Sequence, residues 1–301
     1  MLKLAMNWSI KLKGKLGRAE SLKNHTTLRI GGRARYFVEP ASIQELRLVL
    51  SLAKKQKVQV LILGAGSNLL VSDRGLDAMV IRLSAPCFKK VIFKEKSVEA
   101  GAGVRLAQLI VAAAGRSLGG HEFLAGIPGT LGGAIMMNAG QSQKGRSTAD
   151  LIDRVMVMDY NGNIKIIPKN MIKFGYHSSG LDKYIILNAF LKFKRNNKNR
   201  IKDSIKKYLV ARRQSQDLLW PSAGCVFRNP YGDSAGRLIE LAGLKGKRVG
   251  GAQVSLRHAN FIINRQAATC RDVLRLMQLV KKEVKNKFGV GLEPEVKIWQ
   301  R

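Results

Sequence analysis

The sequence is poor in cysteine and histidine, and these shortages exclude two kinds of site. Its 301 residues include three cysteines and four histidines. The cysteines, Cys87, Cys225 and Cys270, lie far apart and without C-x-x-C spacing, which argues against a disulfide framework and against a zinc site. No histidine stands at helical spacing from a second metal ligand, so we expect no bound metal.

Long apolar runs are missing as well. No uninterrupted stretch reaches the roughly 20 residues that a membrane-spanning helix needs. The lysine-containing N-terminus carries no apolar block of the length found in signal peptides. We therefore expect a cytoplasmic protein without a membrane span, and we expect it to be a monomer.

Acidic residues are scarce relative to basic ones. The chain has 20 Asp and Glu against 53 Lys and Arg, which gives a formal net charge of +33 at pH 7. Such a charge attracts polyanions, either nucleic acid or phosphate-bearing small molecules. The lysines are spread along nearly the whole chain, and no aromatic ladder accompanies them as a platform for single strands requires. We favour a solvated basic surface, with nucleic acid not an obligatory partner.

Glycine, by contrast, is abundant, with 30 residues. The densest stretch, EFLAGIPGTLGGAIMMNAG (122–140), is too apolar for a linker and too interrupted for an ordinary helix. It is either a loop whose backbone amides form a nest around an anionic or planar ligand, or a tight loop between core elements that binds nothing. Both interpretations stay open at this point.

A second glycine stretch, GAGSNLLVSD (64–73), follows the apolar run VQVLIL (58–63), which we expect to be a strand buried on both faces. The stretch lacks the third glycine of the dinucleotide fingerprint and the Gly-Lys-Ser/Thr ending of a P-loop. A Rossmann fold and a P-loop are therefore disfavoured. A backbone nest with Ser67 and Asn68 as side-chain donors stays open.

Other patterns predict an α+β arrangement. The S-x-x-E sequence at Ser42 is the capping-box signature of a helix, Asn161-Gly162 is a hairpin signal, and Thr269 caps a C-terminal helix. We expect residues 1–24 to form a peripheral helix or arm, and residues 290–298 to form the last strand.

Three polar motifs stand out from apolar or glycine-rich surroundings. In PSAGCVFRNP, the Cys225 thiol stays mostly protonated at neutral pH because its ordinary pKa is about 8.5, and it can act as a general acid. The alternative is an ordinary core cysteine. LEPEVKIW offers Glu293 and Glu295, which alternatively pair with surface lysines. FGYHSSG offers Tyr176 and His177 as donors to a substrate carboxylate, or as structural residues.

Taken in order, the motifs resemble those of one known family. This is the UDP-N-acetylenolpyruvoylglucosamine reductases of the shorter type, also called UDP-N-acetylmuramate dehydrogenases, which act in bacterial peptidoglycan synthesis. The matching motifs are NHTTLRIGGRARYFVEP, GAGSNLLVSD, EFLAGIPGTLGGAIMMNAG, FGYHSSG, PSAGCVFRNP, SAGRLIELAGLKG, GGAQVSLRHANFIIN and GVGLEPEV. They cover the chain from about residue 24 to its end.

The resemblance implies an α+β fold with two domains. An FAD-binding domain of the vanillyl-alcohol-oxidase type would be followed by a smaller α+β substrate-binding domain. The composition shift at KRNNKNRIKDSIKK marks the boundary. The predicted limits are 1–195 for the FAD-binding domain, with lobes of about 24–84 and 85–195, and 196–301 for the substrate-binding domain, whose last strand either stays there or returns to the first domain.

The resemblance also implies the ligands. FAD would be held non-covalently, since the first glycine stretch contains no histidine for attachment. NADPH would be the reductant, and UDP-N-acetylglucosamine enolpyruvate the substrate. The positions implied for FAD are Gly64, Ala65, Gly66, Ser67, Asn68, Leu69, Gly126, Ile127, Pro128, Gly129, Thr130, Gly132, Gly133 and Asn138. The positions implied for the substrate are Tyr176, Arg228, Asn229 and Lys245.

The implied reaction is hydride transfer from reduced flavin to the terminal vinyl carbon, followed by protonation of the adjacent carbon. By motif position Cys225 is the acid, and Glu295 stabilises the enolic intermediate at the substrate carboxylate. One position departs from the family pattern, because His177 stands where the motif normally has arginine. We expect the substrate carboxylate to hold His177 protonated. Substitution by Arg228 or another arginine, or a reduced activity, are the alternatives.

Two alternative functions share these features. Another FAD-linked oxidase or dehydrogenase of the same superfamily would be reduced by a substrate other than NADPH. A basic, non-catalytic relative would bind nucleic acid, with an affinity that falls steeply as salt rises. The second alternative is disfavoured because Cys225, Glu295 and both glycine stretches are all present.

Overall fold

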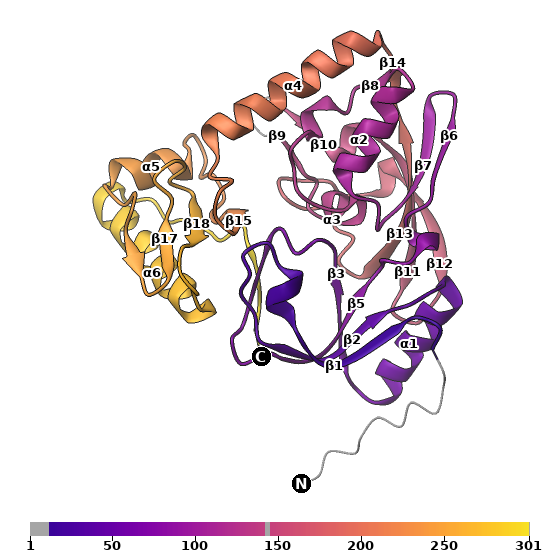
Figure 1. Cartoon of the computed structure of the whole chain (residues 1–301), viewed down its shortest axis with the longest axis horizontal. Coiled ribbons are helices and arrows are strands. Elements are labelled where there is room, and N and C mark those ends of the chain that lie inside the picture. Colours follow the sequence, from indigo (N-terminus) through magenta and orange to yellow (C-terminus); the bar gives the residue numbers. More distant parts are fainter. Residues whose placement is uncertain (1–11, 142–144, 301) are drawn as a thin grey trace. The chain divides into compact units, whose positions relative to one another are not determined.

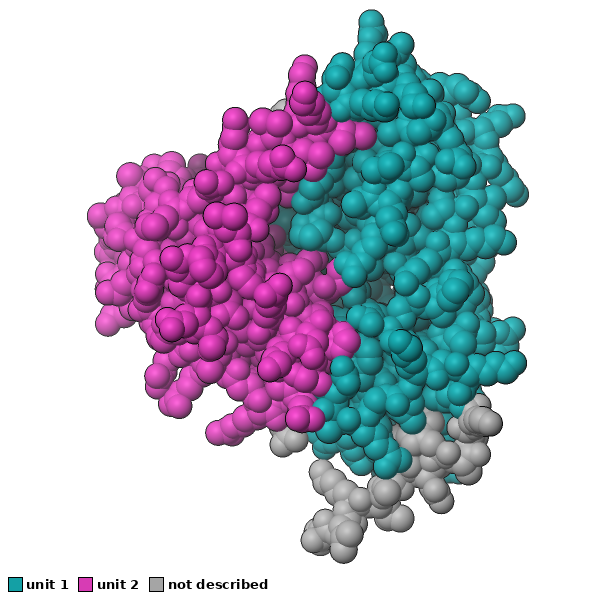
Figure 2. Space-filling view, viewed as in Figure 1, with its two compact units in different colours: residues 1–20, 35–64, 77–203 teal, residues 21–34, 65–76, 204–301 magenta. Residues whose placement is uncertain are grey.

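The computed structural model describes residues 12–141 and 145–300, and these form two compact units (Figure 1, Figure 2). Unit 1 contains the chain up to Glu20, Arg35–Gly64 and Asp77–Asp203, and unit 2 contains Ser21–Ala34, Ala65–Leu76 and the chain from Ser204 onward. Two short N-terminal segments thus belong to the same unit as the C-terminal part. The domain limits 1–195 and 196–301 stay a prediction, since compactness alone does not define a domain.

Unit 1 holds a four-stranded sheet with the order β1-β2-β5-β3. Its elements are β1 (Lys15–Ser21), β2 (Arg33–Glu39), helix α1 (Ile43–Lys55), β3 (Gln59–Leu63) and β5 (Leu76–Arg82). Ser42 caps α1 as predicted, because its hydroxyl accepts the Glu45 N–H at 3.1 Å. The Glu45 carboxylate instead accepts N–H groups from Lys13, Gly14 and Ala41, so the capping box is only half formed.

The structure corrects two expectations for this sheet. Residues 15–21, expected in a peripheral helix or arm, form strand β1, while residues 1–11 of the same prediction lie outside the described residues. β3, expected to be buried on both faces, is an edge strand in which only Leu63 is buried. A continuous apolar run therefore does not by itself show that a strand is central.

A five-stranded antiparallel sheet completes unit 1, with the order β12-β11-β13-β7-β6. Its strands are β6 (Val91–Lys94), β7 (Ser97–Gly101), β11 (Ile152–Asp159), β12 (Ile164–Pro168) and β13 (Tyr184–Lys192). β11 and β12 form the hairpin predicted at Asn161-Gly162, where Gly162 has a φ of 88°. The connections hold α2 (Leu106–Gly115), β8 (Leu118–Gly119), α3 (Leu131–Met136), β9 (Gly140–Gln141), β10 (Arg146–Ser147) and β14 (Lys194–Arg195). Helix α3 packs against β7 and β13.

Unit 2 is built on a four-stranded antiparallel sheet with the order β15-β18-β17-β16. Its elements are β15 (Ser222–Cys225), α5 (Ala235–Leu241), β16 (Arg248–Val249), β17 (Ala252–Val254), β18 (Phe261–Asn264) and α6 (Cys270–Phe288). Helix α6 packs against β16, β17 and α5 and covers an apolar core. Thr269 caps α6 in a full capping box with Asp272, as predicted.

A parallel pair, β4 (Leu69–Val71) and β19 (Lys297–Trp299), also belongs to unit 2. The last strand is shorter than the predicted 290–298. Within residues 290–296 only Pro294 forms an isolated bridge, with Phe227, and proline has no N–H to continue a ladder. Helix α4 (Lys198–Ser215) begins in unit 1 and ends in unit 2. Within residues 12–141 and 145–300, no helix combines the length and the apolar character needed to cross a bilayer.

Candidate active site

The glycine stretch at 122–140 folds as a loop that leads into α3. Thr130 is the N-cap of this helix, and its hydroxyl accepts the Gly133 N–H at 3.3 Å. The Gly132 N–H donates to the Ala102 carbonyl at 2.9 Å. A Cβ atom at Gly132 would lie 2.9 Å from the Ala102 Cβ, so the close approach of the two backbones requires glycine.

Part of this loop offers backbone donors to a ligand. Gly126 is exposed and has a φ of 79°, and Gly129 is half-buried. Among the described residues, no hydrogen-bond acceptor takes the N–H group of Gly126 or of Gly129. Accessible backbone amides of this kind form nests for anionic groups. The loop therefore fits the ligand-binding interpretation better than that of a tight loop that binds nothing.

The first glycine stretch meets this loop at Gly64, which also belongs to unit 1. A Cβ atom at Gly64 would lie 2.9 Å from Thr130 Oγ1 and 4.0 Å from Gly133 Cα. Any side chain at this position would therefore enter the space beside the start of α3. Two bare backbones that approach each other, with open amides nearby, are a cradle of the kind that fits a flavin nucleotide.

The FGYHSSG loop is fastened to the same helix. Ser179 Oγ donates to the Met136 carbonyl at 3.1 Å, and Asn138 Nδ2 donates to the Gly175 carbonyl at 3.0 Å. Asn138 Oδ1 in turn accepts the Ala149 N–H at 3.0 Å. The Asn138 side chain is thus engaged at both ends with protein backbone, and its contact with FAD stays a prediction.

Tyr176 and His177 are presented at the tip of this loop. Tyr176 is exposed, and His177 is half-buried with a left-handed φ of 49°. Their rings meet edge to face, with centroids 4.3 Å apart. The loop therefore holds an imidazole and a phenol together in unit 1, between Gly175 and Ser179, the two loop residues that hydrogen-bond to the α3 region.

In unit 2, an irregularity in the sheet sets the position of Cys225. β15 pairs with β18 at Ser222↔Ile263 and at Cys225↔Phe261, with a register shift between the two pairs. Gly224 lies within this shift and has a φ of 78°, a conformation that glycine adopts without strain. Bulges of this kind redirect a side chain at the end of a strand.

Backbone hydrogen bonds then bring Glu295 beside Cys225. The Glu295 N–H donates at 2.7 Å to the carbonyl of Val226, the residue after Cys225. The Arg228 N–H donates at 2.9 Å to the Glu293 carbonyl. The two motifs PSAGCVFRNP and LEPEVKIW, far apart in the sequence, thus run side by side in unit 2.

Asn68 connects the first glycine stretch to the same place. Its Nδ2 donates to the Glu295 carbonyl at 3.3 Å, and its own carbonyl accepts the Lys297 N–H at 3.1 Å. Ser67 beside it is half-buried, whereas Leu69 is buried in β4. The predicted contacts of Ser67, Asn68 and Leu69 with FAD stay predictions.

Two polar residues that were not predicted as site residues hold this arrangement. Asn260 is buried, and its side chain accepts the Phe227 N–H at 2.9 Å and donates to the Phe227 carbonyl at 2.7 Å. Thr27 Oγ1 donates to the Ser222 carbonyl at 2.6 Å, and the Thr27 N–H donates to the Gly66 carbonyl at 3.1 Å. Both residues lie within motifs quoted above, but no local signal indicated that their side chains make these contacts.

Burial sets the protonation of the two acids. Burial of the Cys225 thiol, together with the negative charge of Glu295, raises the pKa of Cys225 to about 12, and Arg212 opposes the rise. Burial also raises the pKa of Glu295 to about 7, against the opposing charge of Arg228. At neutral pH the thiol keeps its proton while the carboxyl group is close to half-protonated. Adjacent groups with such separated pKa values are typical of general acid–base sites.

Asn229 and Lys245, which were also predicted to bind the substrate, make contacts with other residues of unit 2. Asn229 Oδ1 accepts the Ala235 N–H at 3.0 Å at the start of α5. Lys245 Nζ lies 2.6 Å from Glu240 Oε1. These contacts do not test the predicted roles, which stay predictions. In the described part of the chain, no group of three His, Cys, Asp or Glu side chains is arranged to hold a metal ion.

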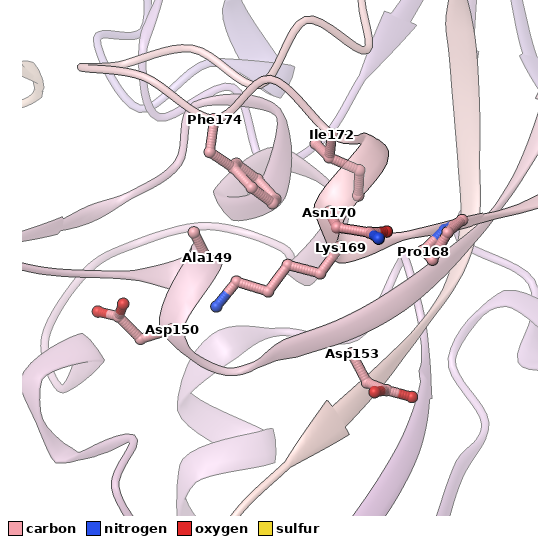
Figure 3. A pocket seen from close by; sticks show the side chains of 8 residues that line it. All are labelled: Ala149, Asp150, Asp153, Pro168, Lys169, Asn170, Ile172 and Phe174. Carbon is pink, nitrogen blue, oxygen red and sulfur yellow. The ribbon is translucent and has the colours of Figure 1, made fainter.

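A separate hollow of about 620 Å³ lies in unit 1 (Figure 3). The Lys169 side chain extends across it toward Ala149 and Asp150 (Figure 3). The two carboxylates that line the hollow already have partners, since Asp150 accepts the Ser147 N–H and Asp153 pairs with Lys192. No predicted site residue lines the hollow, so it is not part of the candidate site. The lining residues are Ala149, Asp150, Asp153, Pro168, Lys169, Asn170, Ile172 and Phe174.

Comparison with known proteins decides the family. A family model described as "UDP-N-acetylenolpyruvoylglucosamine reductase, C-terminal domain" matches residues 214–299, and one described as "FAD binding domain" matches residues 34–167. The chain is 44% identical over 288 residues to UDP-N-acetylenolpyruvoylglucosamine reductase 2 of Symbiobacterium thermophilum, which covers 95% of this chain and 92% of the relative. The chain belongs to the UDP-N-acetylenolpyruvoylglucosamine reductase family.

Further members of this reductase family agree over nearly the whole chain. The reductase of Caldanaerobacter subterraneus is 43% identical over 287 residues, 95% of this chain and 94% of the relative. The crystal structure of the reductase from Thermus caldophilus matches with a TM-score of 0.82 and 35% identity, covering 96% of this chain and all of that one. The resemblance found in the motifs is therefore confirmed.

The two family models and the Thermus caldophilus structure also confirm the predicted fold, an FAD-binding domain followed by the family's C-terminal domain. The length of 301 residues is consistent with the shorter type of reductase. A solvent-stable cholesterol oxidase shares the fold alone, at 15% identity and a TM-score of 0.50 over 61% of this chain and 38% of that one.

Proposed function

We propose that this member of the reductase family reduces UDP-N-acetylglucosamine enolpyruvate to UDP-N-acetylmuramate, with FAD as cofactor and NADPH as reductant. The pair of acids in unit 2 carries the proposal: Cys225 keeps its proton at neutral pH, and Glu295 beside it has a pKa of about 7. The reaction adds a hydride and a proton across a carbon–carbon double bond. A positioned, protonated acid is what the side chains must supply.

Bound FAD would supply the hydride relay between NADPH and the substrate. The chain would hold it through backbone rather than through charged side chains. The N–H groups of Gly126 and Gly129 are proposed to donate to anionic oxygens, and the bare backbone at Gly64 and Gly133 to leave room for a planar group. Ser67 and Asn68 are proposed as additional donors.

Cys225 is proposed to deliver the proton to the carbon that bears the substrate carboxylate. In this step the Sγ–H bond breaks and a carbon–hydrogen bond forms. The protonated form of Glu295 can donate a hydrogen bond to the carboxylate, which a fully ionised carboxyl group cannot do. Tyr176 and His177 are proposed as further donors to this carboxylate, and Arg228, Asn229 and Lys245 as contacts of the nucleotide part.

Anaerobic absorbance of the FAD-loaded protein tests this function in two halves. NADPH should bleach the flavin, and UDP-N-acetylglucosamine enolpyruvate should restore its colour. Cys225→Ala should leave bleaching unchanged and slow the return by about 10²–10⁴-fold, the usual contribution of a general acid. Cys225→Ser keeps a hydroxyl and should retain much of the rate, and Cys87→Ala, at an exposed cysteine of unit 1, is the matched control.

Two results would contradict the proposal. One is wild-type protein whose flavin NADPH bleaches but the enolpyruvate does not re-oxidise, as expected of another flavin-linked dehydrogenase. The other is a Cys225→Ala protein that re-oxidises at the wild-type rate. The monomeric state is part of the proposal, and light scattering of the eluting protein during gel filtration measures it.

A further inference from the structure

Arg212 on α4 carries a guanidinium whose surroundings leave one donor unsatisfied. Its Nε atom is buried without a hydrogen-bond partner among the described residues. Its Nη1 donates only weakly, to Gln216 Oε1 at 3.5 Å. Burial lowers the pKa of Arg212, and no carboxylate is among the groups that oppose this shift. Since buried polar groups are nearly always satisfied, this donor requires an explanation.

The geometry of α4 directs Arg212 away from solvent. Most of this helix is exposed, and Ile201 is its buried residue. Ile205, Tyr208 and Arg212 are half-buried, and their spacing places them on the same helical face as Ile201. The next residue, Arg213, is exposed. The inward position of Arg212 therefore follows from the helical period rather than from a chance rotamer.

The end of α4 that carries Arg212 is tied to the strand partner of Cys225. Arg257 Nη1 donates to the carbonyl of Arg213, the residue after Arg212, at 2.9 Å. Two residues before Arg257, the Ser255 N–H donates at 2.9 Å to the carbonyl of Phe261, which pairs with Cys225 in the sheet.

The positive charge of Arg212 opposes the rise in the pKa of Cys225, and the Cys225 thiolate opposes the fall in the pKa of Arg212. Both residues belong to unit 2. Another partly buried arginine, Arg82, has an acidic partner in Glu39 at 2.8 Å. Arg212 has none in residues 12–141 and 145–300, so its charge is available to an anionic ligand.

Building on the proposed function, we infer that Arg212 binds the substrate carboxylate and stabilises the negative charge that develops there. The carboxylate is bonded to the carbon that Cys225 protonates, so a cation beside Cys225 is placed to receive it. Charge-assisted hydrogen bonds from a guanidinium to a carboxylate are among the stronger polar contacts in proteins. Arg212 is accordingly a catalytic residue of this reductase.

Hydride addition to the terminal vinyl carbon moves the π-electron pair onto the adjacent carbon and its carboxylate, which together become an enolate. The guanidinium N–H groups hydrogen-bond to these oxygens as their charge grows. The Cys225 Sγ–H bond then breaks, the carbon takes the proton, and the carboxylate returns to a single negative charge. The resulting thiolate recovers its proton from solvent.

Binding of two sugar nucleotides to the full-length, FAD-loaded protein tests the assignment without turnover. UDP-N-acetylmuramate carries the carboxylate, whereas UDP-N-acetylglucosamine does not. By calorimetry, Arg212→Met should weaken binding of the former by about 10–100-fold, as expected for one hydrogen-bonded charge, and leave the latter unchanged. Arg213→Met is the matched control and should change neither. Equal losses for both nucleotides would place Arg212 on the diphosphate instead, and no loss for either would also overturn the inference.

Anaerobic stopped-flow absorbance separates this inference from the proposed function. Arg212→Met should be reduced by NADPH at the wild-type rate, whereas its re-oxidation by the enolpyruvate should slow by about 100-fold or more. Arg212→Lys should recover part of that loss. If the wild-type protein itself is not re-oxidised, the proposed function fails. If the wild type is re-oxidised and Arg212→Met matches it, only the role of Arg212 fails.

Circular dichroism melts establish first that each variant is folded. If Arg212→Met does not fold, the pair Arg212→Lys and Arg212→Gln decides the question, because the two differ in charge and both keep a polar end. Faster re-oxidation of the lysine variant supports the inference. Equal rates for the two variants overturn it.

Discussion

Replacing Glu295 by glutamine should change the stability of the folded protein in a pH-dependent way. Burial raises the pKa of Glu295 from 4.5 to about 7, so the folded protein binds this proton more tightly than the unfolded chain does. The associated stabilisation is fully present below the unfolded pKa and is lost as the pH rises through the folded pKa. At 1.36 kcal/mol per pKa unit the shift corresponds to about 3.4 kcal/mol, and solvent screening at this half-buried site reduces the expected effect to about 1–3 kcal/mol.

Urea unfolding followed by circular dichroism measures this effect. Glutamine mimics the protonated carboxyl group at every pH. Glu295→Gln should therefore be close to the wild type at about pH 4.5 and more stable than it by about 1–3 kcal/mol at about pH 8. Glu293→Gln, at an exposed carboxylate in the same motif, is the matched control and should show no such dependence. If the wild type and Glu295→Gln differ in free energy of unfolding by the same amount at both pH values, the raised pKa of buried Glu295 is refuted.

Three further substitutions test other parts of the structure. Asn260→Ala leaves the buried N–H and carbonyl of Phe227 unpaired and should lower the free energy of unfolding by about 2–5 kcal/mol in urea; a loss below about 1 kcal/mol would contradict the hydrogen-bond count. Gly66→Ala would place a Cβ 2.1 Å from the His25 carbonyl at a φ of 65°, so it should lower the melting temperature and the occupancy of FAD in purified protein; unchanged values would argue against this close contact. His177→Arg should flatten a fall in kcat above about pH 7, because arginine stays charged where histidine does not; identical pH profiles would count against a protonated His177.

Local patterns predicted structure well where the physical cause is local. The cap of α6 at Thr269 and the hairpin at Asn161-Gly162 each depend on one or two residues that fix the nearby backbone. The burial of β3 on both faces was predicted wrongly, because β3 is an edge strand. The position of a strand depends on the whole sheet and not on its own apolar run. The last strand was predicted too long, because within residues 290–296 only an isolated bridge between Pro294 and Phe227 forms, and proline has no N–H with which to continue a ladder.

The candidate site was predictable only in its parts. Motif order pointed to Cys225 and Glu295, and the structure adds the hydrogen bond from the Glu295 N–H to the Val226 carbonyl that places the two together. Asn260 and Thr27 were missed, since their partners lie far away in the sequence. Such contacts carry no local signature, because a side-chain hydrogen bond across the fold places no requirement on the residues next to it.

By itself the sequence determined the family of this protein and, with it, the FAD-binding fold. Glycine stretches and helix caps specify backbone conformations that only a few residue types adopt, so their order along the chain is informative without coordinates. Only the tertiary structure decided that burial raises the pKa of Cys225 to about 12, that the pKa of Glu295 is about 7, and that Arg212 has a buried donor to offer. These properties arise from burial and from neighbours brought in by distant segments, and a pKa depends on both.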